Sequence, residues 1–143
     1  PLGWGNWQAT VASITGLVAK ENIVGTLGIL YGGGDGSVYD AMAAAFTGIT
    51  GYSFLVFNLL CAPCFAAIGA IKREMNNAKW TWFAIGYQCG FAYVIGLMIN
   101  QFGNLFAGSA NILGVIVAVI LLAGLIYMLC RPYKEATKLS AKV

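Results

Sequence analysis

One long apolar run, residues 52–74, contains polar, sulfur-bearing and helix-breaking side chains near its middle. They are Asn58, Cys61, Pro63 and Cys64. A helix that only fills lipid has no need of such residues, and polar groups at membrane depth usually belong to a path or a binding site. On a helix, Cys61 and Cys64 would face the same way. Pro63 has no amide hydrogen and clashes with the carbonyl of Leu59, which therefore loses its usual partner.

Two sulfur atoms and a freed carbonyl oxygen are ligands that a dehydrating divalent cation can use. Thiolate sulfur favours a transition metal over Mg²⁺ or Ca²⁺, and broken helices often line the midplane site of a transporter. Two other interpretations stay open. Cys61 and Cys64 could perform thiol redox chemistry, or they could only pack, since cysteine is small and apolar and kinked helices occur in inert spans. Cys89 and Cys130 stand alone, and we expect both to be structural.

The composition places these residues in an integral membrane protein. Of the 143 residues, 59% are hydrophobic and 9% are charged, whereas about a quarter are charged in a soluble domain. The sequence has no histidine, so the commonest transition-metal ligand is missing. All four cysteines lie in or beside apolar runs, which excludes a disulfide-stapled secreted fold. The net charge of +3 comes from two basic clusters, which indicate membrane topology and not nucleic-acid binding.

The fold class that we predict is all-α, a polytopic transmembrane helical bundle in a single region, residues 1–143. Its four membrane segments are roughly residues 9–31, 41–71, 80–102 and 112–130. The first carries Lys20 and Glu21 near its centre, where one charge costs about 2.5–3.5 kcal/mol, so we expect burial against protein. We expect a continuous crossing there. The alternative is a pair of half-segments broken near residues 20–22, re-entrant or interfacial.

Charge predicts the orientation of these segments. The basic clusters are expected on the cytoplasmic side, with Asp35 and Asp40 outside. Four crossings then place both ends in the cytoplasm. The glycine-rich stretch 32–37 lacks the Gly-Lys-Ser/Thr of a phosphate-binding loop, so we interpret it as an exterior turn. No signal peptide is visible at Pro1, and we expect this start to be a cut inside a longer protein.

Several short motifs occur in a characteristic order. They are Gly16-Leu17-Val18-Ala19-Lys20-Glu21, Gly25-Thr26-Leu27, Leu30-Tyr31, Leu59-Leu60-Cys61-Ala62-Pro63-Cys64 and Gly69-Ala70-Ile71-Lys72-Arg73-Glu74. In this order the chain resembles the C-terminal membrane region of the ferrous iron transport protein B (FeoB) family, across roughly residues 3–131. The resemblance implies the second Gate segment of a multi-pass prokaryotic plasma (inner) membrane protein that serves Fe²⁺ uptake. It also implies that Cys64, Cys61 and Glu21 are candidates for the ion path.

The resulting hypothesis is a non-enzymatic part of an Fe²⁺ transporter. Fe²⁺ would lose water at Cys61, Cys64 and the Leu59 carbonyl. Asn58 would lie at the edge of the helix face that Cys61 and Cys64 share. Glu21 or Glu74 would supply negative charge. No permanently bound cofactor is expected. The expected partners are Fe²⁺, the lipid bilayer, and a GTPase domain and first Gate segment elsewhere in the protein, with a homo-oligomer left open. The alternatives are a membrane thiol–disulfide electron carrier and a structural membrane subunit.

Overall fold

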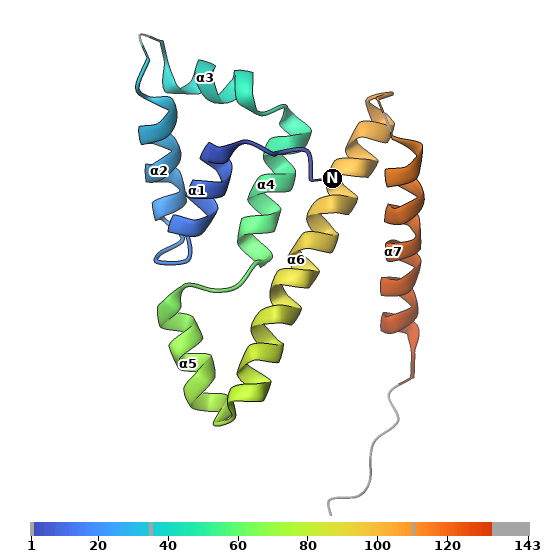
Figure 1. Cartoon of the computed structure of the whole chain (residues 1–143). Helices are drawn as coiled ribbons and strands as arrows, with labels where there is room; N and C mark the ends of the chain where they lie inside the picture. Colours follow the sequence, from blue (N-terminus) through green and yellow to red (C-terminus); the bar gives the residue numbers. More distant parts are fainter. Residues whose placement is uncertain (1, 35, 110, 133–143) are drawn as a thin grey trace, which may run out of the picture.

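The computed structural model of the chain describes residues 2–34, 36–109 and 111–132, and all regular structure in these ranges is helical (Figure 1). The helices are α1 (Trp7–Thr15), α2 (Asn22–Tyr31), α3 (Val38–Ala45), α4 (Gly48–Leu60), α5 (Phe65–Met75), α6 (Ala78–Phe106) and α7 (Ile112–Cys130). Long apolar helices without strands in this part of the chain confirm the predicted all-α membrane bundle.

The first apolar run folds into an antiparallel hairpin of α1 and α2, drawn in blue in Figure 1. The two helices have nine and ten residues. At 1.5 Å per residue they are about 14 and 15 Å long, half of a hydrocarbon core of ~30 Å. Gly16 ends α1, and a Cβ there would meet the side chain of Ile23, so glycine lets α2 return closely. The prediction of a continuous crossing over residues 9–31 is therefore wrong, and the alternative of two half-segments is confirmed.

The second apolar run divides into three helices. The short helix α3 begins at Ser37, whose hydroxyl accepts a hydrogen bond from the Tyr39 amide, and it lies across one end of the bundle (Figure 1). A reciprocal capping box between Thr47 and Thr50 then starts α4. After α4 the chain leaves the helix between Leu60 and Phe65 and continues into α5.

Three helical stretches of the described chain are long and apolar enough to cross a membrane. They are Gly48–Met75, which includes the break between α4 and α5, then Ala78–Phe106 and Ile112–Cys130. The apolar helix α2 is shorter. A hairpin that enters and leaves on one side adds no crossing. The prediction that both ends lie in the cytoplasm needed four crossings and so loses its basis.

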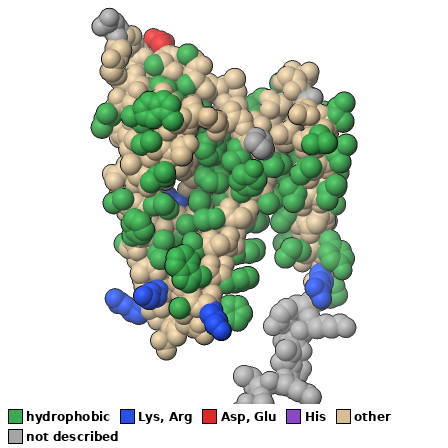
Figure 2. All heavy atoms as spheres, in the orientation of Figure 1, with side chains coloured by type: hydrophobic (Ala, Val, Ile, Leu, Met, Phe, Trp, Pro, Cys, Tyr) green, Lys and Arg blue, Asp and Glu red, His purple; other side chains and the backbone are tan. Residues whose placement is uncertain are grey.

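Most basic groups of the described chain gather at one end of this bundle. Lys72 and Arg73 lie in the last turn of α5, Lys79 in the first turn of α6, and Arg131 caps α7. Figure 2 shows these basic groups at the lower end and acidic atoms at the upper end, where α3 lies. The one-sided distribution of basic groups has the form that the positive-inside rule describes. Asp35, also expected outside, lies beyond the described residues.

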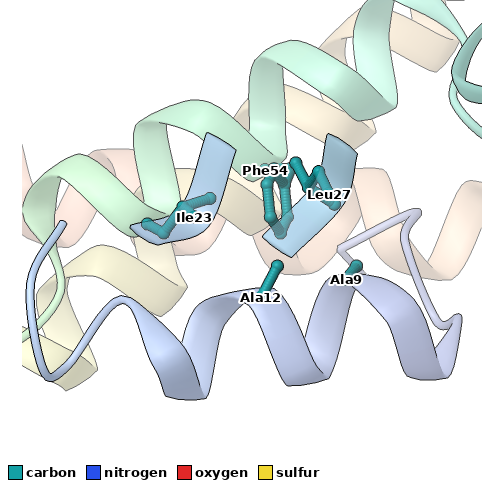
Figure 3. Packing of buried hydrophobic residues seen from close by; sticks show 5 residues of the cluster. All are labelled: Ala9, Ala12, Ile23, Leu27 and Phe54. Atoms are coloured by element: carbon teal, nitrogen blue, oxygen red, sulfur yellow. The ribbon is translucent and has the colours of Figure 1, made fainter. Parts of the chain in front are cut away.

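One hydrophobic cluster attaches the hairpin to α4 (Figure 3). Its buried members are Ala9 and Ala12 of α1, Ile23 and Leu27 of α2, and Phe54 of α4. The small alanines let the neighbouring helices approach closely. The Trp4 ring packs on Phe54 with 5.0 Å between ring centroids. This packing holds the hairpin against α4, with its tip at the level where α4 ends (Figure 1).

Candidate functional site

The break between α4 and α5 follows directly from the local sequence. Cys61 and Cys64 have extended backbone, with φ/ψ of −61°/168° and −60°/161°. The Cys61 amide donates the last helical hydrogen bond, to the Phe57 carbonyl at 2.8 Å. Pro63 disfavours the helical conformation of the preceding residue and has no amide hydrogen for the Leu59 carbonyl. The predicted i, i+3 relation of Cys61 and Cys64 on one helix is therefore wrong.

Lys20, at the tip of the hairpin, supplies the donors that the break removes. Its Nζ donates to the carbonyl oxygens of Asn58, of Leu59 at 3.5 Å and of Cys61 at 3.2 Å. An ammonium group has three N–H donors, so its number of donors matches these three acceptors. It also places a positive charge at the negative end of the α4 dipole. Lys20 is half-buried and bonded to protein, as predicted, whereas Glu21 is exposed, so the predicted burial is wrong for Glu21.

The same hairpin tip also contacts the second half of the broken helix. The Phe65 amide at the start of α5 donates to the Leu17 carbonyl at 2.9 Å. The tip therefore bonds the carbonyl end of α4 through Lys20 and the amide end of α5 through Leu17. Two half-helices and the hairpin tip meet at this point, and the tip provides partners for free backbone groups of both half-helices.

The thiols pair differently from the sequence prediction. Cys61 Sγ lies 3.5 Å from Cys89 Sγ of α6, so Cys89 is a neighbour of the break and its description as a lone residue is wrong. Cys64 is half-buried and occupies the N-cap position of α5 without a side-chain capping bond. Cys130 is exposed at the end of α7. All four thiols are free.

The other predicted site residues are dispersed. Asn58 is 8% exposed, and its side chain donates to the Phe54 carbonyl of its own helix at 2.9 Å. Glu21 is exposed at the hairpin tip beside Lys20, and Glu74 is exposed among the basic residues near the end of α5. No cluster of three or more cysteine and acidic side chains that could hold a metal occurs within residues 2–34, 36–109 and 111–132. The groups that converge at the break are the backbone oxygens that bond Lys20.

A cavity of 280 Å³ opens on this point. Its walls include Ser13 of α1, Lys20 of the tip, and Asn58 and Cys61 at the end of α4. Figure 2 shows a hollow at mid-height with a basic side chain inside it, remote from the other basic groups. The volume is sufficient for several water molecules. A cation in this cavity would meet carbonyl oxygens, a hydroxyl and a thiol.

Sequence reasoning did not find the roles of Lys20 and Cys89. The signal for Lys20 was present, because a charge inside an apolar run needs a partner. The sequence did not indicate that its partners lie 38 to 41 residues away. For Cys89, no local signal distinguishes a packed cysteine from one that faces a second thiol.

The chain is similar to one protein family and to several curated proteins. The family described as "Gate: Nucleoside recognition" matches residues 1–78. The Fe(2+) transporter FeoB of Methanocaldococcus jannaschii is 41% identical over 105 residues, which are 73% of this chain and 15% of the relative. The Fe(2+) transporter FeoB of Staphylococcus aureus strain COL is 39% identical over 106 residues, 74% of this chain and 16% of the relative. That of Helicobacter pylori is 33% identical over 101 residues, 65% of this chain and 15% of the relative.

The chain thus spans about 15% of the length of these curated relatives. No solved structure matches it.

Proposed function

The chain belongs to the Gate family, whose description is "Nucleoside recognition", and from its relatives we propose a different cargo. We propose that the chain forms the part of an Fe²⁺ transporter in which the ion loses its water and crosses the bilayer. The resemblance to the FeoB family in the sequence motifs is confirmed by the curated relatives. Those relatives are Fe(2+) transporters and match nearly three quarters of the chain. This supports a cation, and not a nucleoside, as the cargo.

The observation that carries the proposal is the interrupted α4–α5 crossing. Backbone carbonyls of Asn58, Leu59 and Cys61 turn toward one point beside a cavity, at the level where the hairpin tip ends. In a lipid environment, irregular backbone is tolerated only against protein or a water-filled cavity. Carbonyl oxygens at the end of a half-helix are suited to a cation because they carry the negative end of the dipole.

Cys61 and Cys64 are the side chains that we propose as ligands during passage. Cys61 lines the cavity, and Cys64 lies on the other side of Pro63 in extended backbone. Fe²⁺ accepts sulfur ligands, and a bound cation promotes loss of the thiol proton. We retain Asn58 as a neighbour of the path, and we retain Glu21 beside Lys20 and Glu74 near the end of α5 as sources of negative charge.

The wider context is also a proposal. We place the protein in a prokaryotic plasma membrane, with the end that carries Lys72, Arg73, Lys79 and Arg131 facing the cytoplasm. A GTPase domain and a first Gate segment would belong to the same protein outside these residues. The thiol–disulfide carrier is not favoured, because the relatives are ion transporters.

Fe²⁺ uptake tests the function. The full-length protein is reconstituted into vesicles, and Cys64→Ala is compared with Cys130→Ala, which removes an exposed thiol far along α7. We expect Cys64→Ala to reduce uptake by about tenfold or more, since even outer partners of a metal ligand contribute 10- to 100-fold. Cys130→Ala should leave uptake unchanged. Equal uptake by both variants would remove Cys64 from the path, and no uptake by the wild-type protein would refute the function.

A further inference from the structure

The ammonium of Lys20 has the position and the coordination of a bound cation. It lies among the carbonyl oxygens of Asn58, Leu59 and Cys61. These oxygens come from the end of one helix and the extended residue that follows it. Among the described residues no carboxylate forms an ion pair with Lys20, and its ammonium donates to these backbone oxygens.

The oxygens do not owe their arrangement to Lys20. The Asn58 and Leu59 carbonyls are the orphan acceptors that any α-helix leaves at its C-terminus, and Pro63 ensures that the following backbone cannot bond Leu59. Any cation that reaches this point would find the same acceptors. Oxygen atoms suit hard and borderline divalent cations.

The location of Lys20 also favours a removable occupant. The residue is carried by the hairpin tip between α1 and α2, not by either half of the broken helix. The tip also contacts the broken helix through its backbone, where the Leu17 carbonyl accepts from the Phe65 amide. Lys20 lines the cavity, whose wall also includes Thr10 and Ser13 of α1. Withdrawal of one flexible side chain into that cavity would therefore uncover the carbonyls.

We propose that the Asn58, Leu59 and Cys61 carbonyls form a cation-binding site, that the Lys20 ammonium occupies this site as a tethered substitute, and that a divalent cation binds when Lys20 withdraws. The inference rests on the proposed function, because it assigns a site and an access step to the same path. Tethered and free cation compete, so each excludes the other. When no ion is present, Lys20 thereby provides hydrogen-bond donors for the three carbonyl oxygens at the break.

Mn²⁺ binding to the full-length protein in detergent tests the competition. Mn²⁺ is a redox-stable divalent probe that electron paramagnetic resonance detects directly. Lys20→Met removes the charge at nearly constant length, Lys20→Arg keeps a charge, and Lys72→Met removes a lysine from the exposed end of α5. We expect Lys20→Met to bind Mn²⁺ at least about tenfold more tightly, because the Lys20 ammonium no longer competes with Mn²⁺ for the carbonyl oxygens. Lys20→Arg and Lys72→Met should retain wild-type affinity.

A role of Lys20 as a helix cap alone predicts a different result. Lys20→Met would then unfold at lower temperature and would gain no affinity for Mn²⁺, which would overturn the proposal. A second measurement uses the wild-type protein in case Lys20→Met does not fold. Mass spectrometry follows acylation of Lys20 by an amine reagent, with Lys72 as the internal control. Saturating Mn²⁺ should accelerate acylation of Lys20 only, and an unchanged rate at Lys20 would also overturn the proposal.

The two proposals fail differently. If the wild-type protein takes up Fe²⁺ and Lys20→Met binds Mn²⁺ with unaltered affinity, the proposal of a tethered cation is refuted and the transport function stands. If Lys20→Met binds Mn²⁺ more tightly but the wild-type protein takes up no Fe²⁺, the cation site is supported and the proposal of iron transport is refuted.

Discussion

Mild oxidation is expected to join Cys61 to Cys89 and not to Cys64. The Sγ atoms of Cys61 and Cys89 are 3.5 Å apart, with both side chains half-buried. A disulfide bond measures about 2.05 Å, so the two sulfur atoms must approach by about 1.5 Å. Cys64 lies beyond Pro63 in extended backbone, and no sulfur contact joins it to Cys61 in the described part of the chain.

The expected stabilisation follows from the length of chain that the bond would close. Cys61 and Cys89 are 28 residues apart in sequence. The chain-entropy relation gives about 3.5 kcal/mol at 25 °C for such a loop. This is an upper value, because structure that persists in the denatured state reduces the entropy difference. The new bond would connect the end of α4 to the middle of α6.

The assay combines mass spectrometry with thermal unfolding. Purified full-length protein is treated with copper–phenanthroline, which removes two electrons as the two thiols release two protons. Peptides are then identified without reduction. We expect a linked peptide pair containing Cys61 and Cys89, together with a higher unfolding temperature that a reducing agent reverses. Cys64→Ser should preserve this link, whereas Cys61→Ser should abolish it.

A linked peptide that joins Cys61 to Cys64 would refute the reasoning, since it would require both thiols on one side of an unbroken turn. Linkage that occurs only after denaturation would also contradict it. In both cases the position of α6 against the break would be wrong.

Two further predictions concern the packing that holds the break in place. Gly103→Ala should lower the stability by about 1–3 kcal/mol, because its Cβ would overlap the Ile49 side chain and force the α4–α6 contact apart. Gly90 on the same helix has open space around it, so Gly90→Ala should be neutral or stabilising by up to about 1 kcal/mol. Equal unfolding temperatures for Gly103→Ala and Gly90→Ala would contradict the α4–α6 packing. Thr47→Ala should cost about 1 kcal/mol through loss of the α4 capping box, whereas Thr47→Ser should retain it. Chemical denaturation of the purified protein measures this difference, and an unaltered Thr47→Ala midpoint would show that α4 does not need the cap.

Several properties of the protein follow from local sequence and were predictable. An apolar composition with few charges requires a membrane. Lys72, Arg73 and Lys79 between two apolar runs predict a basic end of the bundle, and the described structure gathers basic groups at one end. Pro63 predicts that the Leu59 carbonyl loses its helical partner, and that carbonyl does bond a group outside its helix. Each of these properties depends on a residue and its near neighbours.

The geometry of the site depends on contacts between distant segments. Hydropathy alone does not tell a continuous crossing of residues 9–31 from a hairpin, because both bury the same apolar residues. The choice follows from packing of Ala9, Ala12 and Phe54. That packing brings Lys20 to carbonyls 38 to 41 residues away and leaves Cys61 facing Cys89. A buried ammonium must find acceptors, but the fold selects which acceptors it reaches.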